Sequence, residues 1–333
     1  MTGMRAFAEQ LRARLFACLQ PILPITGPYA LVDVPNHANV GDSAIYLGEL
    51  AWLRAAGVPE PDYVSDVFSH DDDHLRARVP HGTILIHGGG NVGDLWRRHQ
   101  ALREQVIERF PHHRIIQLPQ TIHFESPAAL ERAATRFSSH RNFTLLVRDG
   151  RSLELARDAL KCPARSCPDA AFGLGPLVPG GPATAEVVAL ARTDKEMPGG
   201  GPPTGIPVFD WLEDDRTPLL RLERTLRSLG TGLWLRQRLR VAVAEQRVRR
   251  GCAALGRGRV VMTDRLHGHI LCLLMGIPHV AVDNNYGKLR SFVEAWTAEA
   301  PGVRFCESWS EAGDALRSLR GEDTRPAAPH AGI

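Results

Sequence analysis

Three short segments combine glycine with polar side chains that bind anions or transfer protons, and each follows an apolar run. They are residues 39–43, 87–94 and 263–269 of a chain of 333 residues. In open α/β sheets, ligands bind at the loops that follow the carboxyl ends of the strands. Each segment is therefore a candidate part of a binding site, although each also allows a simpler structural interpretation.

The first segment reads Asn39-Val-Gly41-Asp42-Ser43. Gly41 permits a tight turn, and Asp42 or Ser43 can cap a helix that begins there. The free amides at a helix N-terminus attract anions, so Asn39 and Asp42 are candidate site residues. The alternative is a helix cap that binds no ligand.

The second segment reads His87-Gly-Gly-Gly-Asn91-Val-Gly-Asp94. Its three successive glycines, which include Gly89 and Gly90, let the backbone approach a ligand closely and expose amides. The spacing departs from G-x-G-x-x-G, and the lysine of a phosphate-binding P-loop is missing. A glycine-rich active-site turn therefore fits this segment better than a nucleotide-cofactor fingerprint does.

The third segment places Arg265 and His267 where a strand is expected to meet a helix. An arginine and a histidine two residues apart at a helix N-terminus can hold an anion and shuttle a proton. The alternative is a structural ion pair between Asp264 and Arg265. Tyr286 and Lys288 follow the next expected strand, so we expect Lys288 to reach the same crevice.

Two charged segments carry less specific signals. Residues 71–74 (Asp-Asp-Asp-His) have side chains that could bind a metal, but a solvated acidic loop is the better interpretation, and we expect no metal. A basic region is either a solvated helix face or a surface that docks weakly near an anionic, lipid-linked substrate at the membrane. Its arginines are Arg236, Arg238, Arg240, Arg247, Arg249 and Arg250.

The elements that must position these residues alternate between apolar strands and helices in the first half of the chain. Uniformly apolar strands separated by helices indicate a parallel sheet that is covered on both faces. The expected strands are residues 29–34, 83–87, 114–118 and 143–147, and the expected helices are residues 41–57, 95–110 and 126–137.

A second unit follows a linker rich in Gly and Pro at residues 173–181. A Gly/Pro-rich loop is expected at 197–207, and a polar tail after Arg320 is expected to fray. The chain is too long for one comfortable core, so we expect two domains, 1–178 and 179–333. The expected strands of the second are 186–191, 259–263 and 279–282, and its helices are 219–255, 268–275 and 288–296.

Composition limits the classes of partner. The formal net charge of +3 suits an anionic small substrate and is too mild for a nucleic-acid-binding face. The six cysteines lie scattered in apolar surroundings, so we expect reduced, buried thiols and a cytoplasmic protein. Arg5, Glu9 and Arg12 interrupt the N-terminal apolar residues, so we expect an amphipathic helix there and neither a signal peptide nor a membrane span.

Taken in order, these motifs resemble the polysaccharide pyruvyl transferase family over residues 30–297. The resemblance implies two Rossmann-like domains that face a cleft, as in the two-domain (GT-B) glycosyltransferases. It also implies transfer of a pyruvyl group from phosphoenolpyruvate to a sugar of an extracellular polysaccharide or of its lipid-linked precursor, with no cofactor. The motifs are Asn39-x-Gly41-Asp42, Gly-Gly-Gly-Asn91, Gln117-Leu-Pro-Gln120-Thr121, Arg265-Leu-His267 and Tyr286-x-Lys288.

The resemblance carries Arg265, His267 and Arg192 over from the family's conserved Arg and His residues. With Lys288, the two arginines would bind the carboxylate and phosphate of the donor. His267 is a candidate acid or a phosphate ligand that protonates the leaving group, and Asp42 and Asp94 are candidate bases for the sugar hydroxyls. Further expected substrate contacts are Asn39, Gly89, Gly90, Asn91 and Tyr286.

Two rival functions remain open on the sequence. One is a glycosyltransferase of the same fold that uses a nucleotide sugar, which would need a pocket for the base. The other is a sugar- or anion-binding protein that catalyses nothing. For the pyruvyl transferase, residues 88–94 and 265–288 should lie on facing walls of one cleft.

Overall fold

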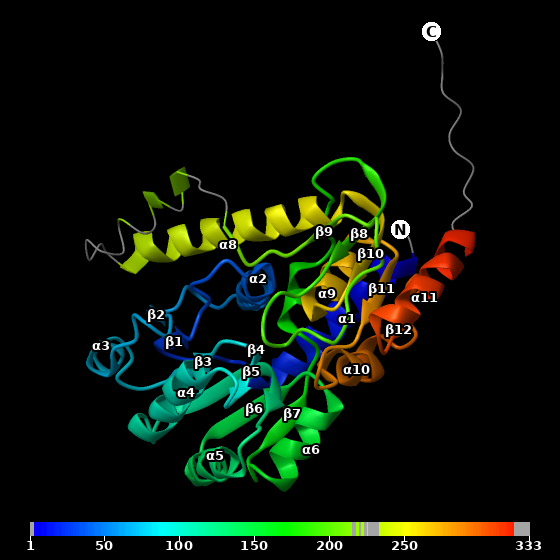
Figure 1. Ribbon diagram of the computed structural model, residues 1–333. Helices are drawn as coiled ribbons and strands as arrows, with labels where there is room; N and C mark the ends of the chain where they lie inside the picture. Colours follow the sequence, from blue (N-terminus) through cyan, green and yellow to red (C-terminus); the bar gives the residue numbers. More distant parts are fainter. Residues whose placement is uncertain (1–2, 215–217, 220, 223–224, 226–232, 323–333) are drawn as a thin grey trace.

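The computed structural model describes residues 3–214, 218–219, 221–222, 225 and 233–322. Two parallel β-sheets, each flanked by helices, make up the protein (Figure 1). This is an α/β fold with two Rossmann-like halves of the GT-B type, as the sequence predicts.

The first sheet has seven strands in the order β2-β1-β3-β5-β6-β7, and β4 pairs with β5 outside this path. Its strands are β1 (Tyr29–Val32), β2 (Tyr63–Ser65), β3 (Thr83–Ile86), β4 (Gly89–Gly93), β5 (Arg114–His123), β6 (Phe143–Val147) and β7 (Ala164–Ser166). The helices in this half are α1 (Gly3–Leu19), α2 (Val40–Ala55), α3 (Asp72–Arg78), α4 (Arg97–Arg109), α5 (Pro127–Ser139) and α6 (Gly150–Asp158), with short turns η1 (Gln20–Ile22) and η2 (Ala170–Leu174).

The second sheet has five strands in the order β12-β11-β10-β8-β9. Its strands are β8 (Ala185–Leu190), β9 (Val208–Phe209), β10 (Gly258–Thr263), β11 (His279–Val282) and β12 (Val303–Cys306). The helices in this half are α8 (Leu233–Leu255), α9 (Leu266–Met275), α10 (Lys288–Phe292) with the π-helical turn η3 (Val293–Thr297), and α11 (Trp309–Glu322).

Both sheets reverse their strand order next to their first strand. In the first sheet β2 lies on one side of β1 and β3 on the other, and in the second β9 and β10 flank β8 in the same way. At such a switch point the connections leave in opposite directions, which opens a crevice at the carboxyl ends of the two strands. The topology therefore predicts where a ligand binds in each half.

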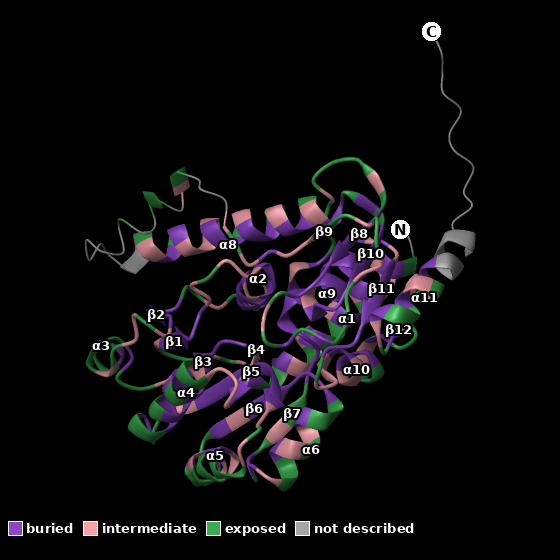
Figure 2. Ribbon diagram, in the orientation of Figure 1, coloured by how far each residue is buried: buried purple, intermediate pink, exposed green. Residues whose placement is uncertain are grey.

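Successive side chains of a strand point to opposite faces of the sheet, and in the first sheet apolar side chains are buried on both faces. Leu85 of β3 belongs to one buried cluster, whereas its neighbours Ile84 and Ile86 belong to another. The first of these clusters also contains Val261 and Ala281 from the second sheet, so the two sheets share a core. Figure 2 shows the strands as mostly buried.

Two helices, α1 and α8, each contact the other half of the chain. Arg5 of α1 donates to the carbonyl of Met275 at the end of α9. Arg240 of α8 donates to Asp66 beside the first sheet at 2.7 Å. The expected domain boundary at residue 178 falls between β7 and β8, but the division into domains stays a prediction.

Most elements expected from the sequence are present with shifted ends. The expected strand 114–118 continues to His123 as the longer β5, and residues 197–207 form a loop. The strands β2, β4, β7, β9 and β12 were not predicted, and β4 forms within the segment 87–94 that was expected to be a glycine-rich turn. The expected helix 219–255 is seen as α8 from Leu233, and most of residues 219–232, like the tail after Glu322, lies outside the described residues.

The acidic segment 71–74 is not a free loop, because Asp71 caps α3. Its carboxylate accepts the backbone N–H of His74 at 2.8 Å, so the run of aspartates forms the first turn of a helix. In the part of the chain that the structure describes, no group of three or more His, Cys, Asp and Glu side chains is placed to hold a metal ion.

Several arginines of the basic region pair with carboxylates of this chain, Arg249 with Glu245 on the exposed helix face and others with largely buried carboxylates. Arg240 pairs with Asp66, and both Arg247 and Arg250 pair with Asp214. They therefore add little free positive charge to the surface. None of the helices in the described ranges has the length and apolarity that a membrane crossing requires. All six cysteines are free thiols, and five of them are buried.

Candidate active site

The switch points of both sheets open onto a single cavity of about 340 Å³. Asp33 and His87 line it directly behind β1 and β3, and Arg192 and Arg265 line it behind β8 and β10. Arg148 adds a fifth strand end, behind β6. The geometry of parallel sheets thus brings together residues that are far apart in the sequence.

The two segments expected on facing walls do meet across this cavity. His87, Gly90 and Asn91 line one side, and Arg265, Leu266, His267 and Lys288 line the other. The approach is close at Gly90, where a Cβ atom would lie 2.5 Å from Nζ of Lys288. Any side chain at position 90 would displace the end of the Lys288 side chain, so glycine lets Lys288 reach this turn.

Arg265 forms the N-cap of α9, where the backbone leaves β10 for the helix. Asp210 holds its guanidinium through two hydrogen bonds of 2.7 Å, to Nε and Nη2. The Asp264–Arg265 pair considered as an alternative is not the one formed, because Asp264 accepts the backbone N–H of Arg192. Asp210 orients Arg265 at the cavity wall and neutralises part of its charge.

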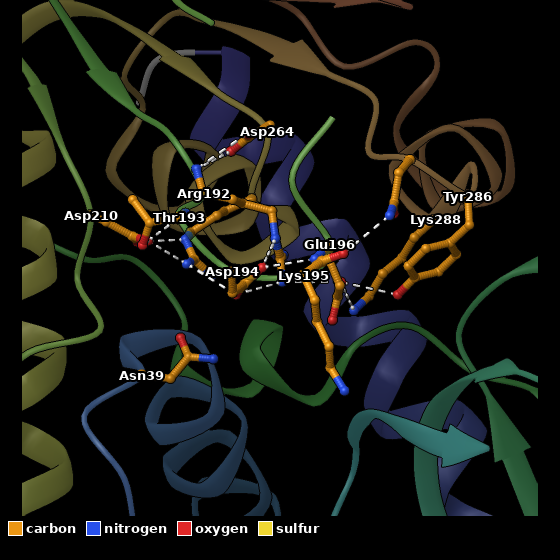
Figure 3. Close-up of polar contacts among 12 residues, drawn as sticks. Asn39, Arg192, Thr193, Asp194, Lys195, Glu196, Asp210, Asp264, Tyr286 and Lys288 are labelled. Atoms are coloured by element: carbon orange, nitrogen blue, oxygen red, sulfur yellow. Dashed lines mark hydrogen bonds and ion pairs between the residues drawn. The ribbon is translucent and has the colours of Figure 1, made fainter. Parts of the chain in front are cut away.

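A chain of ion pairs lines the second half of the site (Figure 3). Arg192 binds Asp194 through Nε and Nη2, and its Nη2 lies 3.1 Å from Glu196. Glu196 also accepts from Lys288 at 3.2 Å and from the hydroxyl of Tyr286 at 3.0 Å. Figure 3 shows Tyr286 and Lys288 pointing toward Glu196.

Glu196 is buried, and its ionisation is fixed by these partners. Burial alone would raise its pKa, but Lys288 and Arg192 outweigh this effect and lower the pKa to about 2. Burial lowers the pKa of Lys288, against the opposing charge of Glu196. An anion that enters the cavity beside Lys288 could therefore bind its ammonium group together with Glu196 or in place of Glu196.

The first half contributes the N-terminus of α2. Asn39 is the N-cap, and its side-chain oxygen accepts the N–H of Gly41 while its amide donates to Asp42 at 2.7 Å. Burial raises the pKa of Asp42, but His37 and His267 outweigh burial and leave the pKa below its usual value. Asp42 is therefore ionised and faces the cavity as a hydrogen-bond acceptor.

His267 and Arg148 meet over a buried aspartate. Nε2 of His267 lies 3.4 Å from Oδ2 of Asp169 and 3.4 Å from Nη1 of Arg148. Arg148 is wholly buried, donates from Nε to Thr121 at 3.0 Å and forms an ion pair with Asp169. Burial would raise the pKa of Asp169, but Arg148 and His267 lower it well below the usual range.

Gly41 lets α2 approach the helix that carries His267. A Cβ atom at this position would lie 2.3 Å from Nδ1 of His267. The two predicted motifs, one from each half of the chain, are thus in direct contact, and this packing explains the glycine.

Three buried nitrogen atoms at the cavity have no hydrogen-bond partner in the described residues. They are Nε2 of His87, Nη2 of Arg148 and Nε1 of Trp211. A buried donor without a partner costs about 1–3 kcal/mol, so native structures rarely leave one unpaired. All three belong to residues that line one cavity, where water or a polar ligand could satisfy them.

The first-half wall also holds a strained residue that the sequence did not single out. Asp33 has a φ of +65°, which is unusual for a residue other than glycine. Its carboxylate lies 2.7 Å from Nδ1 of His99 and accepts from Asn91 at 3.4 Å. Strain of this kind is held by its surroundings and is common at functional sites.

Not every expected site residue lines the cavity. Asp94 accepts the backbone N–H groups of Glu125 and Ser126 and lies outside the cavity, so the role expected of it as a base is not carried further. Gly89 and Tyr286 are not among the residues that line the cavity, but the hydroxyl of Tyr286 donates to Glu196, which does. Asn39, Asp42, Gly90, Asn91, Arg192, Arg265, His267 and Lys288 do line it.

Several residues that line the cavity were not predicted from the sequence. Asp33 and Arg148 each follow an apolar strand, so the strand-end rule could have found both. Trp211, Asp194 and Glu196 come from loops whose position only the tertiary structure defines.

Two Rossmann-like sheets, with a cavity at their switch points that arginine, lysine, histidine and carboxylate side chains line, define an α/β protein of the GT-B type. The profile of the polysaccharide pyruvyl transferase family matches residues 39–286. The chain belongs to this family, whose members transfer pyruvyl groups in polysaccharide synthesis.

Curated relatives agree with this assignment. Pyruvyl transferase 1 of Schizosaccharomyces pombe is 34% identical over 80% of this chain and 69% of its own length. The putative pyruvyl transferase EpsO of Bacillus subtilis is 28% identical over 88% of this chain and 92% of its own length.

The fold is also found in a solved structure of low sequence similarity. A functionally uncharacterised protein from Klebsiella pneumoniae superposes with a TM-score of 0.61 at 15% identity, covering 90% of this chain and 99% of its own. At this identity the likeness concerns the fold alone.

Proposed function

We propose that this chain transfers the pyruvyl group of phosphoenolpyruvate to a pair of hydroxyls on a saccharide and so forms a pyruvate ketal. The observation that carries the proposal is the set of unpartnered buried donors at the cavity, His87, Arg148 and Trp211, beside Lys288. Phosphoenolpyruvate is small and carries both a carboxylate and a phosphate, which such donors can satisfy. A cavity of about 340 Å³ is at the small end of ligand sites, as this donor requires.

The phosphate is best accommodated between Arg148 and Lys288. Both side chains converge on Gly90, because a Cβ atom there would lie 2.5 Å from Nζ of Lys288 and 2.9 Å from Nη2 of Arg148. Two cations on one glycine turn form a site for a multivalent anion. Arg265 donates from Nε and Nη2 to Asp210 and from Nη2 to Asp194, so its Nη1 group would bind the carboxylate.

The reaction balances without a cofactor. C3 of the enolpyruvate takes up a proton, C2 is attacked by two sugar hydroxyls in turn, and the bond from C2 to the phosphate oxygen breaks. Each sugar hydroxyl loses one proton, and in the overall balance one of these protons is added to C3 and the other leaves with the phosphate. The products are the ketal and inorganic phosphate.

The positions of His267 and Asp42 suggest their roles. His267 lies 3.4 Å from Nη1 of Arg148, so in this proposal it faces the phosphate and protonates the leaving oxygen. Asp42 is ionised at the opposite wall, where it can accept a hydroxyl proton from the saccharide. We include the buried, reduced cysteines as support for a cytoplasmic reaction.

A donor screen tests this function. Purified protein is incubated with a saccharide panel and either phosphoenolpyruvate or nucleotide sugars, and phosphate and nucleotide release are measured. We expect phosphate release that depends on both phosphoenolpyruvate and a saccharide. Release of nucleotide from a nucleotide sugar, with none from phosphoenolpyruvate, would instead identify a glycosyltransferase. A lack of turnover with every donor, together with saccharide binding, would indicate a binding protein.

A further inference from the structure

A buried histidine–glutamate pair lies at the end of β3, beside the donor site. Nδ1 of His87 is 2.8 Å from Oε2 of Glu49, and both side chains are almost fully buried. The other carboxylate oxygen of Glu49 accepts the backbone N–H of Gly88 at 2.8 Å. Because an ionised carboxylate only accepts, Nδ1 of His87 carries the proton and the ring orientation is fixed.

The opposite ring nitrogen of His87 is not used by the fold. Nε2 is buried, has no hydrogen-bond partner in the described residues, and belongs to a ring that lines the cavity. A structural histidine uses both nitrogens, as His140 does by reaching the carbonyl of Phe110 with one and the N–H of Asn142 with the other. Nε2 of His87 is therefore free of the hydrogen bonds that hold the fold in the described residues, and it belongs to a ring at the cavity wall.

The charges around His87 favour its protonated form. Burial alone would lower its pKa, but the charge and hydrogen bond of Glu49 outweigh burial and raise the pKa. Asp42 of α2 and Asp33 behind β1 act in the same direction, and His37 opposes them weakly. Of these groups, only Glu49 touches the ring.

We propose that His87 is the catalytic acid that protonates C3 of the enolpyruvate through Nε2, and that Glu49 is the residue that positions it. This inference rests on the proposed function. The N–H bond of Nε2 breaks as the π electrons of the enol form the new C–H bond at C3. Neutral His87 then accepts the proton of the second attacking hydroxyl, which returns the site to its starting state.

This assignment divides the acid chemistry between two histidines. His267 lies against Arg148 and Asp169, where a phosphate would bind, and so serves the leaving group. His87 lies in the other half of the chain at the end of β3, where Glu49 is its ion-pair partner, so in this proposal its proton serves the carbon end of the donor. A substitution at either histidine should therefore impair a different step.

Three variants test the proposal by steady-state kinetics and by calorimetric binding of phosphoenolpyruvate. His87→Gln should lower kcat by roughly a hundredfold or more while the affinity for phosphoenolpyruvate changes little. His140→Gln, which alters a buried histidine of the same half away from the cavity, should leave kcat unchanged. Near-normal kcat in folded His87→Gln would overturn the proposal.

Glu49→Gln provides a readout that a purely structural role would not move. The variant removes the charge that raises the pKa of His87, so the protonated acid is lost at a lower pH. The basic limb of the kcat profile should shift to lower pH, and the His87 signal in an NMR titration of the free protein should shift with it. An unchanged profile together with an unchanged titration would contradict the positioning role.

The outcome also separates this inference from the proposed function. If wild-type protein neither binds nor consumes phosphoenolpyruvate, the proposed function fails, whatever the variants do. If the wild type is active and His87→Gln remains active, only the acid assignment fails, and His267 or Asp42 must supply the proton.

Discussion

Replacing Arg148 by lysine should separate binding of the donor from maintenance of the fold. Arg148 uses three nitrogens for three purposes, since Nε donates to Thr121, Nη1 pairs with Asp169 and Nη2 is left for the cavity. Lysine carries a single ammonium group at the end of its side chain. It can neutralise Asp169 or reach the ligand, but it cannot do both.

The size of the effect follows from the lost contact. A hydrogen bond to a charged group contributes about 1.5–3 kcal/mol, and each 1.4 kcal/mol is about tenfold in affinity. Arg148→Lys should therefore raise the Kd of phosphoenolpyruvate by about 10- to 100-fold. Arg148→Met would break the buried ion pair and leave Asp169 with His267 and the backbone N–H of Ala171. Breaking a buried pair costs about 3–5 kcal/mol of stability, so this variant is the poorer test.

Isothermal titration calorimetry gives the Kd, and thermal unfolding shows whether each variant is folded. Arg240→Lys is a matched control, because Arg240 pairs with the buried Asp66 outside the cavity. The control should lose some stability and keep its affinity for phosphoenolpyruvate. A folded Arg148→Lys protein with wild-type affinity would refute the placement of the donor against Nη2.

Other substitutions test the remaining parts of the site. His267→Ala should lower kcat by roughly a hundredfold in a folded protein, and near-normal turnover would make that histidine structural. Arg265→Ala should mainly weaken donor binding. Gly41→Ala places a methyl group 2.3 Å from His267 Nδ1, so it should cost about 1–3 kcal/mol of unfolding free energy and reduce kcat. Unchanged thermal unfolding of Gly41→Ala would show that the two helices separate easily.

The fold could be predicted because its signals are local. Strands such as β3 and β6 are short, wholly apolar and followed by polar residues, which is the pattern of a covered parallel sheet. The switch points could not be predicted, because strand order depends on which strands pair in three dimensions. Short strands such as β2 and β9 were missed for the same reason, since their pairing partners stabilise them.

Site residues that belong to a sequence motif could be predicted, whereas the residues that bind and orient them, which lie far away in the sequence, could not. Arg265 and His267 were found because of their spacing at a strand end, but the sequence gives no sign that Asp210 holds Arg265. The role of Glu49 was hidden as well, because a single glutamate in the apolar helix α2 carries no motif. Such pairs depend on tertiary contacts between residues far apart in the chain.

The most direct test of the account is the binding of phosphoenolpyruvate itself to the purified, acceptor-free protein. Calorimetry with phosphoenolpyruvate, and in parallel with a nucleotide sugar, measures which anion the cavity accepts. We predict saturable binding of phosphoenolpyruvate that Arg148→Lys weakens and that inorganic phosphate competes with. Binding of the nucleotide sugar alone, or binding of phosphoenolpyruvate that is indifferent to Arg148, would contradict the central claim.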